Sequence, residues 1–416
     1  MSNSHPYLNN INAFFKWVVL CLVIGIIIGT ITAFFLSSLE WVTAFRASHQ
    51  WVIYGLPLIG LCIGLLYHYA GSSVQKGNNV LIESHNNSEV SIPFKLAPLV
   101  LIGTLLTHLV GGSAGREGTA VQMGGSIAAP FSKWFKLNET QRKTIIIMGI
   151  SAGFAAVFGT PWAGAIFAIE LMSFKKIKWE AIIPTIVVAF IAHYTCIQWG
   201  IQHSSYHVNT IASFNSQNIG WALLAGILFG LAALVFTLSG EAFKFVFNTI
   251  KWAPLRPLIG GIILLCIYSF FDAQQWMGLG LPTISASFES PVVYYDFLIK
   301  IVLTSFTLSA GFKGGEVTPL FFIGATLGNI LILFFPLPMG LLAAMGFVAV
   351  FAGATHCVIA SIILGLELFG TSAGVFIGVA CISAYFSSGM QGIYYAQHKT
   401  GAKYDVYNYI KKVSSL

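Results

Sequence analysis

The chain has 416 residues, of which 56% are hydrophobic and 8% are charged, and its formal net charge is +7. Soluble domains carry roughly 25% charged residues, so this composition excludes a water-soluble globular fold and indicates a multi-span helical membrane protein. The basic residues are spread over short loops without an aromatic-basic surface, so we expect no nucleic-acid partner.

The clearest candidates for membrane-spanning segments are the apolar runs at 12–37, 98–111, 217–239 and 339–369. The first run is long and leads into another apolar stretch, unlike a signal peptide with its short core and cleavage site, so it predicts a retained helix. We expect five parts and no soluble regulatory domain: a cytoplasmic segment (1–11), a first membrane repeat (12–205), a linker (206–215), a second membrane repeat (216–398) and a short basic cytoplasmic tail (399–416).

Three basic clusters predict the orientation in the membrane. They are Lys133, Lys136, Arg142 and Lys143; then Lys175, Lys176 and Lys178; and finally Lys399, Lys403, Lys411 and Lys412. The positive-inside rule places all three in the cytoplasm, so both termini are predicted to be cytoplasmic in a multi-pass protein of the cell membrane, a bacterial inner membrane. The six cysteines lack metal-binding spacings, and we infer packing thiols, no metal and no cofactor.

Two parts of the chain repeat one pattern. Ser113–Thr119 and Ser309–Pro319 each contain Gly-x-Glu-x-Thr after an apolar run, and each is followed by an Ala/Gly-rich apolar stretch ending in Glu-Leu, at Ile166–Leu171 and Ile362–Leu368. Matched features about two hundred residues apart predict an internal duplication of opposite orientation, with the binding site where the repeats meet.

Four glycine-rich breaks interrupt the apolar runs, at residues 77–81, 115–119, 314–319 and around 392–395. A helix that begins or ends inside a membrane directs unpaired backbone N–H groups and the positive end of its dipole at the centre. Such groups attract an anion without a full buried cation, so the breaks predict an anion pathway.

Glu117 is the most informative residue, because a carboxylate flanked by glycines in an apolar region marks an ion or proton route. When charged it can occupy an anion site, and when neutral it can yield that site, so we predict that it is both gate and proton carrier. The adjacent Arg116 pairs either with Glu117 or with another carboxylate, Glu170 or Glu367. We take Glu316 as the counterpart of Glu117 in the second half, with a structural role.

At these motifs the sequence resembles the CLC family of chloride channels and chloride/proton antiporters, from about residue 12 to 398. Gly115-Arg-Glu-Gly-Thr119 is similar to the family's Gly-Arg-Glu-Gly-Pro, which implies that Glu117 is the gating glutamate. The resemblance also implies an all-α fold of two inverted-topology repeats whose broken helices meet at a central anion pathway, and a homodimer whose interface comes from the second halves of the repeats.

The departures from the chloride motifs resemble the family's fluoride-exporting branch. Asn78 stands where the serine that contacts chloride is expected, Val317 replaces a phenylalanine, and Thr318 adds a hydroxyl group. Tyr394 aligns with the pathway tyrosine, although the adjacent Tyr395 is an alternative. The resemblance implies this set of anion-binding residues: Asn78, Asn79, Gly115, Arg116, Gly118, Val317, Thr318 and Tyr394.

The predicted function is therefore a fluoride/proton antiporter, with fluoride and protons as its substrates, and not an enzyme. A chloride/proton antiporter or a chloride channel is the alternative, favoured if Asn78 and Val317 are neutral variations. Leu171 follows Glu170 where chloride/proton antiporters have a second glutamate, which leaves the inner proton route unassigned. Isolated histidines are assigned to hydrogen bonds with neighbouring helices, and the abundant aromatic residues mostly to lipid contact and anchoring at the membrane interface.

Overall fold

The computed structural model describes residues 6–172, 179–271, 273–398 and 403–406. Within these residues the secondary structure is helical, apart from a single β-bridge. Helix α1 begins at Pro6, so the segment expected to precede the membrane region is largely helical. Lys175, Lys176 and Lys178, like Lys399, Lys411 and Lys412, lie outside the described residues.

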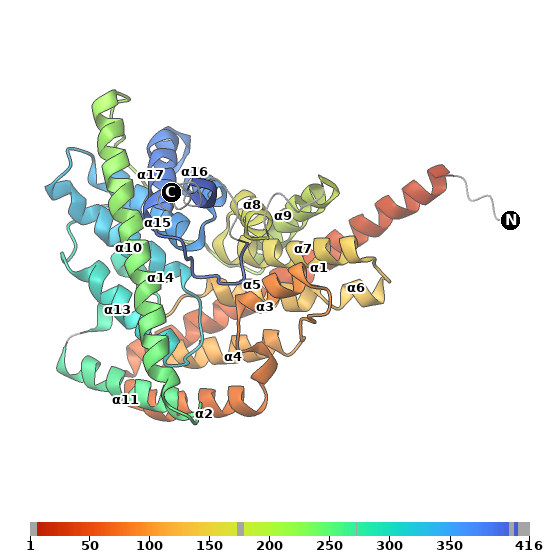
Figure 1. Cartoon of the computed structure of the whole chain (residues 1–416), viewed down its shortest axis with the longest axis horizontal. Coiled ribbons are helices and arrows are strands. Elements are labelled where there is room, and N and C mark those ends of the chain that lie inside the picture. Colours follow the sequence, from red (N-terminus) through yellow and green to blue (C-terminus); the bar gives the residue numbers. More distant parts are fainter. Residues whose placement is uncertain (1–5, 173–178, 272, 399–402, 407–416) are drawn as a thin grey trace, which may run out of the picture.

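The helices of the first half are joined by short turns. They are α1 (Pro6–Ser48), α2 (Leu56–Tyr69), α3 (Asn78–Asn86), α4 (Leu96–Leu109), α5 (Glu117–Ala128), α6 (Phe131–Trp134), α7 (Glu139–Phe158), α8 (Pro161–Leu171) and α9 (Ile182–Gln198), with 3-10 turns at Gln50–Gly55, Ser72–Val74 and Trp179–Ala181. Figure 1 shows them from red to yellow on one side of the molecule.

The second half repeats this order on the other side (Figure 1). Its helices are α10 (Ser216–Asn248), α11 (Leu255–Phe270), α12 (Leu281–Ala286), α13 (Asp296–Ser309), α14 (Val317–Ile330), α15 (Met339–Thr355), α16 (Val358–Phe369) and α17 (Gly374–Ser387), with 3-10 turns at Gln274–Trp276, Leu331–Leu333 and Thr371–Ala373.

The predicted duplication is confirmed by the matching elements. Helices α4 and α13 both have 14 residues. Each is followed by a left-handed glycine, Gly111 at φ 86° and Gly311 at φ 108°, and then by a helix that begins within a buried region. The fold is thus an all-α architecture of two repeats.

The two repeats run in opposite directions, as contacts between α8 and α16 show. Glu170, near the end of α8, accepts hydrogen bonds from the N–H groups of Ile359 and Ala360 in the first turn of α16 at 3.1 and 2.8 Å. Glu367, near the end of α16, accepts them from Trp162 and Ala163 in the first turn of α8 at 3.1 and 2.7 Å. Each helix end therefore caps the start of the other, which requires antiparallel neighbours.

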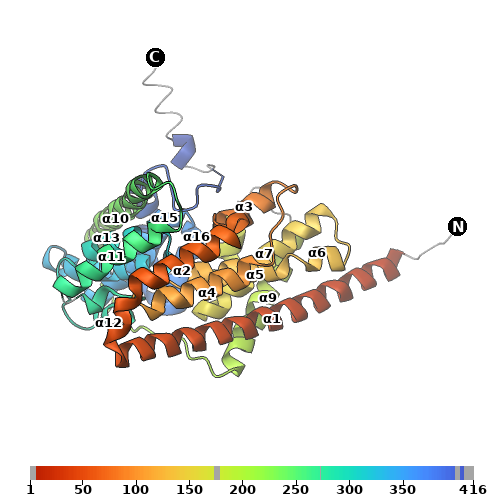
Figure 2. The same ribbon diagram turned by 90° about the horizontal axis from the view of Figure 1, so that it is seen from below.

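The apolar run 339–369, expected to be one span, is two helices. His356, at φ 57°, ends α15 in a left-handed conformation and α16 begins two residues later. Long apolar helices do occur elsewhere, over Phe14–Ser48, Gln50–Tyr69, Trp179–Gln198 and Ser216–Asn248. Figure 2 shows α1 as a long rod along one edge, beside the shorter helices of the interior.

Helices α5, α7, α14 and α15 form the centre, and nearly all of their residues are buried. They approach closely because glycines face each other: a Cβ on Gly124 would lie 2.1 Å from the oxygen of Gly149, and one on Gly324 would lie 2.0 Å from the oxygen of Gly346. Many phenylalanines also pack here rather than against lipid, contrary to our expectation. Phe321 stacks on Phe347 with ring centroids 4.0 Å apart.

Candidate functional site

The two glycine-rich loops that begin α5 and α14 meet at the centre of the molecule. Gly115 donates its N–H to the carbonyl of Gly315 at 2.6 Å, and Gly315 donates to the carbonyl of Gly115 at 2.8 Å, in an antiparallel bridge. The site therefore lies where the repeats join, as the duplication predicted.

Glycine is required at this junction because the two backbones are almost in contact. A Cβ on Gly315 would lie 2.7 Å from the amide nitrogen of Gly118, a distance that real side chains do not adopt. A Cβ on Gly115 would lie 2.9 Å from the oxygen of Gly315. Larger residues would separate the starts of α5 and α14, which together shape the site.

Glu117, the first residue of α5, directs its carboxylate at the first turn of α14. It is buried, with 2% of its surface exposed. The amide of Thr318 donates to its Oε2 at 3.0 Å, the Thr318 hydroxyl lies 2.6 Å from both carboxylate oxygens, and the amide of Arg116 donates to Oε2 at 3.2 Å. The side chain of one repeat is thus held by the helix start of the other.

This arrangement is that of an anion site at a helix N-terminus. The first N–H groups of α14 have no intrahelical partner, and the helix dipole favours negative charge there. A carboxylate that binds these donors occupies the place that a small anion would take. Movement of the side chain would release the Thr318 hydroxyl and N–H to such an anion.

The charged neighbour of the carboxylate is Arg116. Its Nε lies 3.6 Å from Oε1 of Glu117 and is a buried nitrogen without a hydrogen-bond partner. Glu170 and Glu367 bind backbone N–H groups instead. Of the alternatives that the sequence left open, the structure therefore favours a charge contact between Arg116 and Glu117.

The assignment of Glu316 as the counterpart of Glu117 is wrong by one residue. The bridge pairs Gly115 with Gly315, so Arg116 corresponds to Glu316 and Glu117 to Val317. Glu316 precedes α14, whereas Val317 is its first residue and is buried. The Gly-x-Glu-x-Thr pattern gave the wrong alignment of the two loops because the second loop carries an extra glycine, Gly314, at φ 156°.

Asn78 and Asn79 begin α3 and are both buried, but their side-chain amides differ in their hydrogen bonds. Oδ1 of Asn78 has no hydrogen-bond partner, and Nδ2 of Asn78 lies 3.2 Å from the place of a Cβ on Gly118, beside the centre. Asn79 instead accepts from the amide of Ala396 at 3.0 Å and donates to the carbonyl of Lys76 at 3.4 Å. Only Asn78 has unused hydrogen-bonding capacity next to Gly118.

Tyr394 and Tyr395 differ in their exposure to solvent. Tyr394 is 5% exposed, whereas Tyr395 is 55% exposed and lies 3.5 Å from Glu83 through its hydroxyl group. The break at 392–395 is a loop after α17, not the start of a helix as at the other three breaks. Burial thus favours Tyr394 as the tyrosine nearer the centre.

A cavity of about 560 Å³ leads towards these residues. Its inner lining includes Asn78, Glu316 and Tyr394, and exposed Lys76 and Lys244 line its outer part. Further cationic groups, Arg256 and Lys313, also line it. This excess of positive charge raises the local concentration of anions.

Sequence reasoning missed a fifth break, Gly278-Leu-Gly280-Leu-Pro282. Gly278 and Gly280 have φ angles of 54° and 72° and lead into α12, the counterpart of α3. The buried Lys300 donates to the carbonyls of Trp276 and Gly278 at 2.9 and 2.8 Å and so holds this loop. The signal was present, since Gly-x-Gly-x-Pro has the glycine and proline spacing of the family motif to which the Asn78 segment was compared.

Comparisons with known proteins agree on one family. The family model described as voltage gated chloride channel matches residues 59–389. The chloride/fluoride channel protein of Pseudomonas syringae pv. tomato is 42% identical over 396 residues, which cover 94% of this chain and 88% of that protein. The H(+)/Cl(-) exchange transporter ClcA of Cronobacter sakazakii is 27% identical, with 83% of this chain and 80% of that protein covered.

Solved structures give the same result. A crystal structure of a CLC-type fluoride/proton antiporter is similar with a TM-score of 0.88 and 38% identity, over 92% of this chain and 98% of that chain. A slow cyanobacterial Cl-/H+ antiporter has a TM-score of 0.78 at 20% identity, over 96% of this chain and 98% of that chain, a likeness of fold alone.

Proposed function

Because the chain belongs to the voltage-gated chloride channel (CLC) family, we propose that it is a membrane fluoride/proton antiporter that exports fluoride in exchange for protons, with Glu117 as gate and proton carrier. The observation that carries this proposal is the contact of the Glu117 carboxylate with the amide and hydroxyl of Thr318. Protonation removes the negative charge that these donors hold, and fluoride then takes its place.

Fluoride, rather than chloride, is favoured by the donors at this point. Fluoride holds its water strongly, so a pathway must replace that water with strong hydrogen bonds. The Thr318 hydroxyl, the first amides of α14 and Nδ2 of Asn78 supply donors, and Val317 occupies the start of α14 without one in its side chain. The 38% identical antiporter structure is named for fluoride and protons, in agreement with this assignment.

The remaining roles follow from position. Gly115 and Gly118 keep the two helix starts together, Arg116 offsets the charge of Glu117, and Tyr394 borders the inner end of the cavity. Asn79 binds the loop that carries Tyr394 and acts through that loop.

We assign the cavity to the cytoplasmic side, so that fluoride enters through it. Arg142, in the first turn of α7, donates to the carbonyl of Ser84 in α3 at 3.1 Å, which places α3, whose start lines the cavity, beside the basic segment that leads into α7. Basic loops remain in the cytoplasm. Fluoride then enters from this side and leaves past Glu117, with the net direction set by the fluoride and proton gradients.

Two copies of the chain form the functional unit in this proposal, each with its own pathway. Helix α8 packs against α9 and α16, and α16 packs against α17, so we infer that their exposed apolar side chains form one face. Trp162, Ile183, Ile359 and Val375 on this face are each about half exposed or more, at 50%, 71%, 48% and 51%. The mass of the purified protein in detergent tests the dimer.

The function is tested with purified protein in liposomes, by following fluoride, chloride and proton movement for the wild type and for Glu117→Gln. We expect wild-type fluoride efflux to exceed chloride efflux by at least tenfold and to carry protons inward against their gradient. Glu117→Gln, which cannot ionise, should lose proton movement.

Two outcomes would contradict the proposal in different ways. Equal fluoride and chloride efflux with proton coupling would indicate a chloride/proton antiporter. Efflux without proton movement in the wild type would indicate a channel and would remove the carrier role from Glu117.

A further inference from the structure

The loop that carries Tyr394 is fixed on both sides of this residue. Before it, the amide of Ile393 donates to the carbonyl of Ala354 at the end of α15, at 2.8 Å. After it, the amide of Gln397 donates to the carbonyl of Tyr394 at 3.1 Å and closes a tight turn. The position of the tyrosine is therefore set by whatever holds this turn.

A side chain of the other repeat holds the turn. The amide of Ala396, inside the turn, donates to Oδ1 of Asn79 at 3.0 Å. Asn79 is 8% exposed, so little water competes for this bond. The contact joins residues 317 positions apart in the chain and links the first turn of α3 to the Tyr394 loop.

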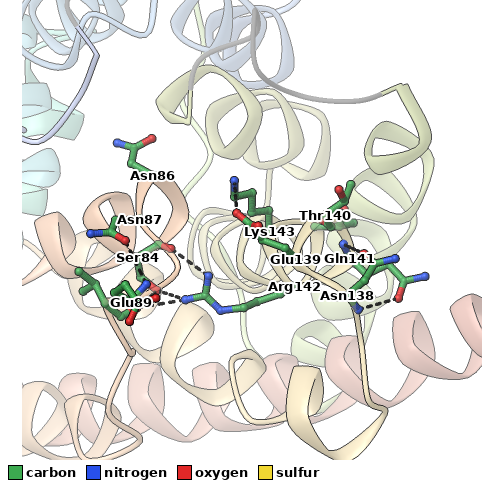
Figure 3. Close-up of polar contacts among 12 residues, drawn as sticks. Ser84, Asn86, Asn87, Glu89, Asn138, Glu139, Thr140, Gln141, Arg142 and Lys143 are labelled. Carbon is green, nitrogen blue, oxygen red and sulfur yellow. Dashed lines mark hydrogen bonds and ion pairs between the residues drawn. The ribbon is translucent and has the colours of Figure 1, made fainter.

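Helix α3 is a firm support because its other end is anchored as well. Arg142 donates to the carbonyls of Ser84 and Val90 at 3.1 Å each, and Figure 3 shows its guanidinium group between α7 and the end of α3. A capping box of Asn138 and Gln141 fixes the start of α7, from which Arg142 extends. Asn79 thus connects the Tyr394 loop to an element that is held at both ends.

We propose that Asn79 is a positioning residue: it fixes the Tyr394 loop against α3, so that Tyr394 and the adjacent Asn78 keep a constant spacing at the inner end of the anion pathway. The inference rests on the proposed function. It replaces a direct anion contact for Asn79, because Oδ1 is engaged by Ala396 and the Asn79 amide nitrogen faces the carbonyl of Lys76.

The test is a double-mutant cycle in liposomes, with apparent fluoride KM and maximal rate measured for Asn79→Ala, Tyr394→Phe and the pair. Asn79→Ala leaves the Ala396 amide unpaired, and we expect it to raise KM by about tenfold with a smaller change in maximal rate. If Asn79 acts through the tyrosine, the pair should have the KM of Tyr394→Phe alone, within about twofold.

Two further variants separate this role from a general loss of structure. Ala396→Pro removes the donor of the same hydrogen bond and should reproduce the KM of Asn79→Ala. Asn87→Ala is the matched control, because Asn87 directly follows α3, is exposed and accepts from the amide of Glu89 instead of binding the loop; it should leave KM unchanged.

Multiplied effects in the pair would show that Asn79 acts independently of Tyr394 and would overturn the proposal, as would an unchanged KM in both Asn79→Ala and Ala396→Pro. Failure of the proposed function is a separate result, because it appears in the wild type as missing fluoride selectivity or proton coupling, whereas the cycle compares variants for whichever anion is transported.

Discussion

At the scale of single residues, Thr318 binds Glu117, the proposed gate, and in the proposed function it also binds the anion. Its hydroxyl donates to the Glu117 carboxylate at 2.6 Å, and its backbone amide donates to the same group at 3.0 Å. Only the hydroxyl can be removed by substitution, so the two donors can be tested separately. A hydrogen bond to a charged group contributes about 1.5–3 kcal/mol, enough to influence the choice between anions.

We therefore predict that Thr318→Val lowers the ratio of fluoride to chloride efflux by about tenfold, because fluoride gains more than chloride from a hydroxyl donor. Thr318→Ser keeps the hydroxyl and should retain most of the wild-type ratio. Both rates are measured with ion-selective electrodes on one set of liposomes. An unchanged ratio in Thr318→Val would assign the selectivity to the backbone amides and Asn78.

The sequence identified the glutamate but not all of its surroundings. Glu117 could be recognised because an ionisable residue between glycines in an apolar run has few structural explanations. Asn79 and Glu316 could not be placed in the same way. Their roles depend on a hydrogen bond to Ala396 and on the pairing of Gly115 with Gly315, both of which join the two repeats and leave no local pattern.

At the scale of elements, the ends of α8 and α16 are capped by each other. Short helices inside a membrane protein leave N–H groups that water cannot satisfy, and each such group costs several kcal/mol if unpaired. Glu170 and Glu367 each accept two of these bonds. The symmetry indicates that Glu170 stabilises the junction of the repeats and is not the missing inner proton carrier.

This assignment predicts that Glu170→Gln and Glu367→Gln both retain proton-coupled fluoride efflux, since the amide oxygen still accepts one of the two backbone N–H groups and only the other loses its acceptor. Glu170→Ala leaves two N–H groups unpaired and should lower the midpoint of thermal unfolding by several degrees. Unfolding is followed by size-exclusion chromatography of heated samples. Loss of proton movement in Glu170→Gln alone would instead place Glu170 on the proton route.

Other boundaries show why element prediction was only partly successful. The glycine-rich loops before α5 and α14 were recognised because both chemistry and spacing repeat. The division of 339–369 at His356 was not, because an apolar run with one histidine has the composition of a single span, and the break arises from one left-handed residue between two apolar helices.

At the scale of the whole molecule, orientation decides whether the cavity is an entrance or an exit. Helix α3 lines the cavity and is bound to Arg142 in the first turn of α7. The linker between the repeats follows α9, a candidate membrane span that begins after the second basic cluster of the sequence. If basic loops stay in the cytoplasm, the linker lies outside the cell and the cavity opens inward.

The orientation can be measured with single cysteine substitutions at two exposed positions, Lys133→Cys before α7 and Thr210→Cys in the linker. A membrane-impermeant maleimide should label Thr210→Cys in intact cells and Lys133→Cys only in inside-out vesicles, above the labelling of the wild type with its native cysteines. Labelling of Lys133→Cys in intact cells would show that the protein has the opposite orientation in the membrane. Fluoride would then meet Glu117 before the cavity, so the order of the two along the pathway depends on the placement of these loops, whereas the net direction of exchange follows the fluoride and proton gradients.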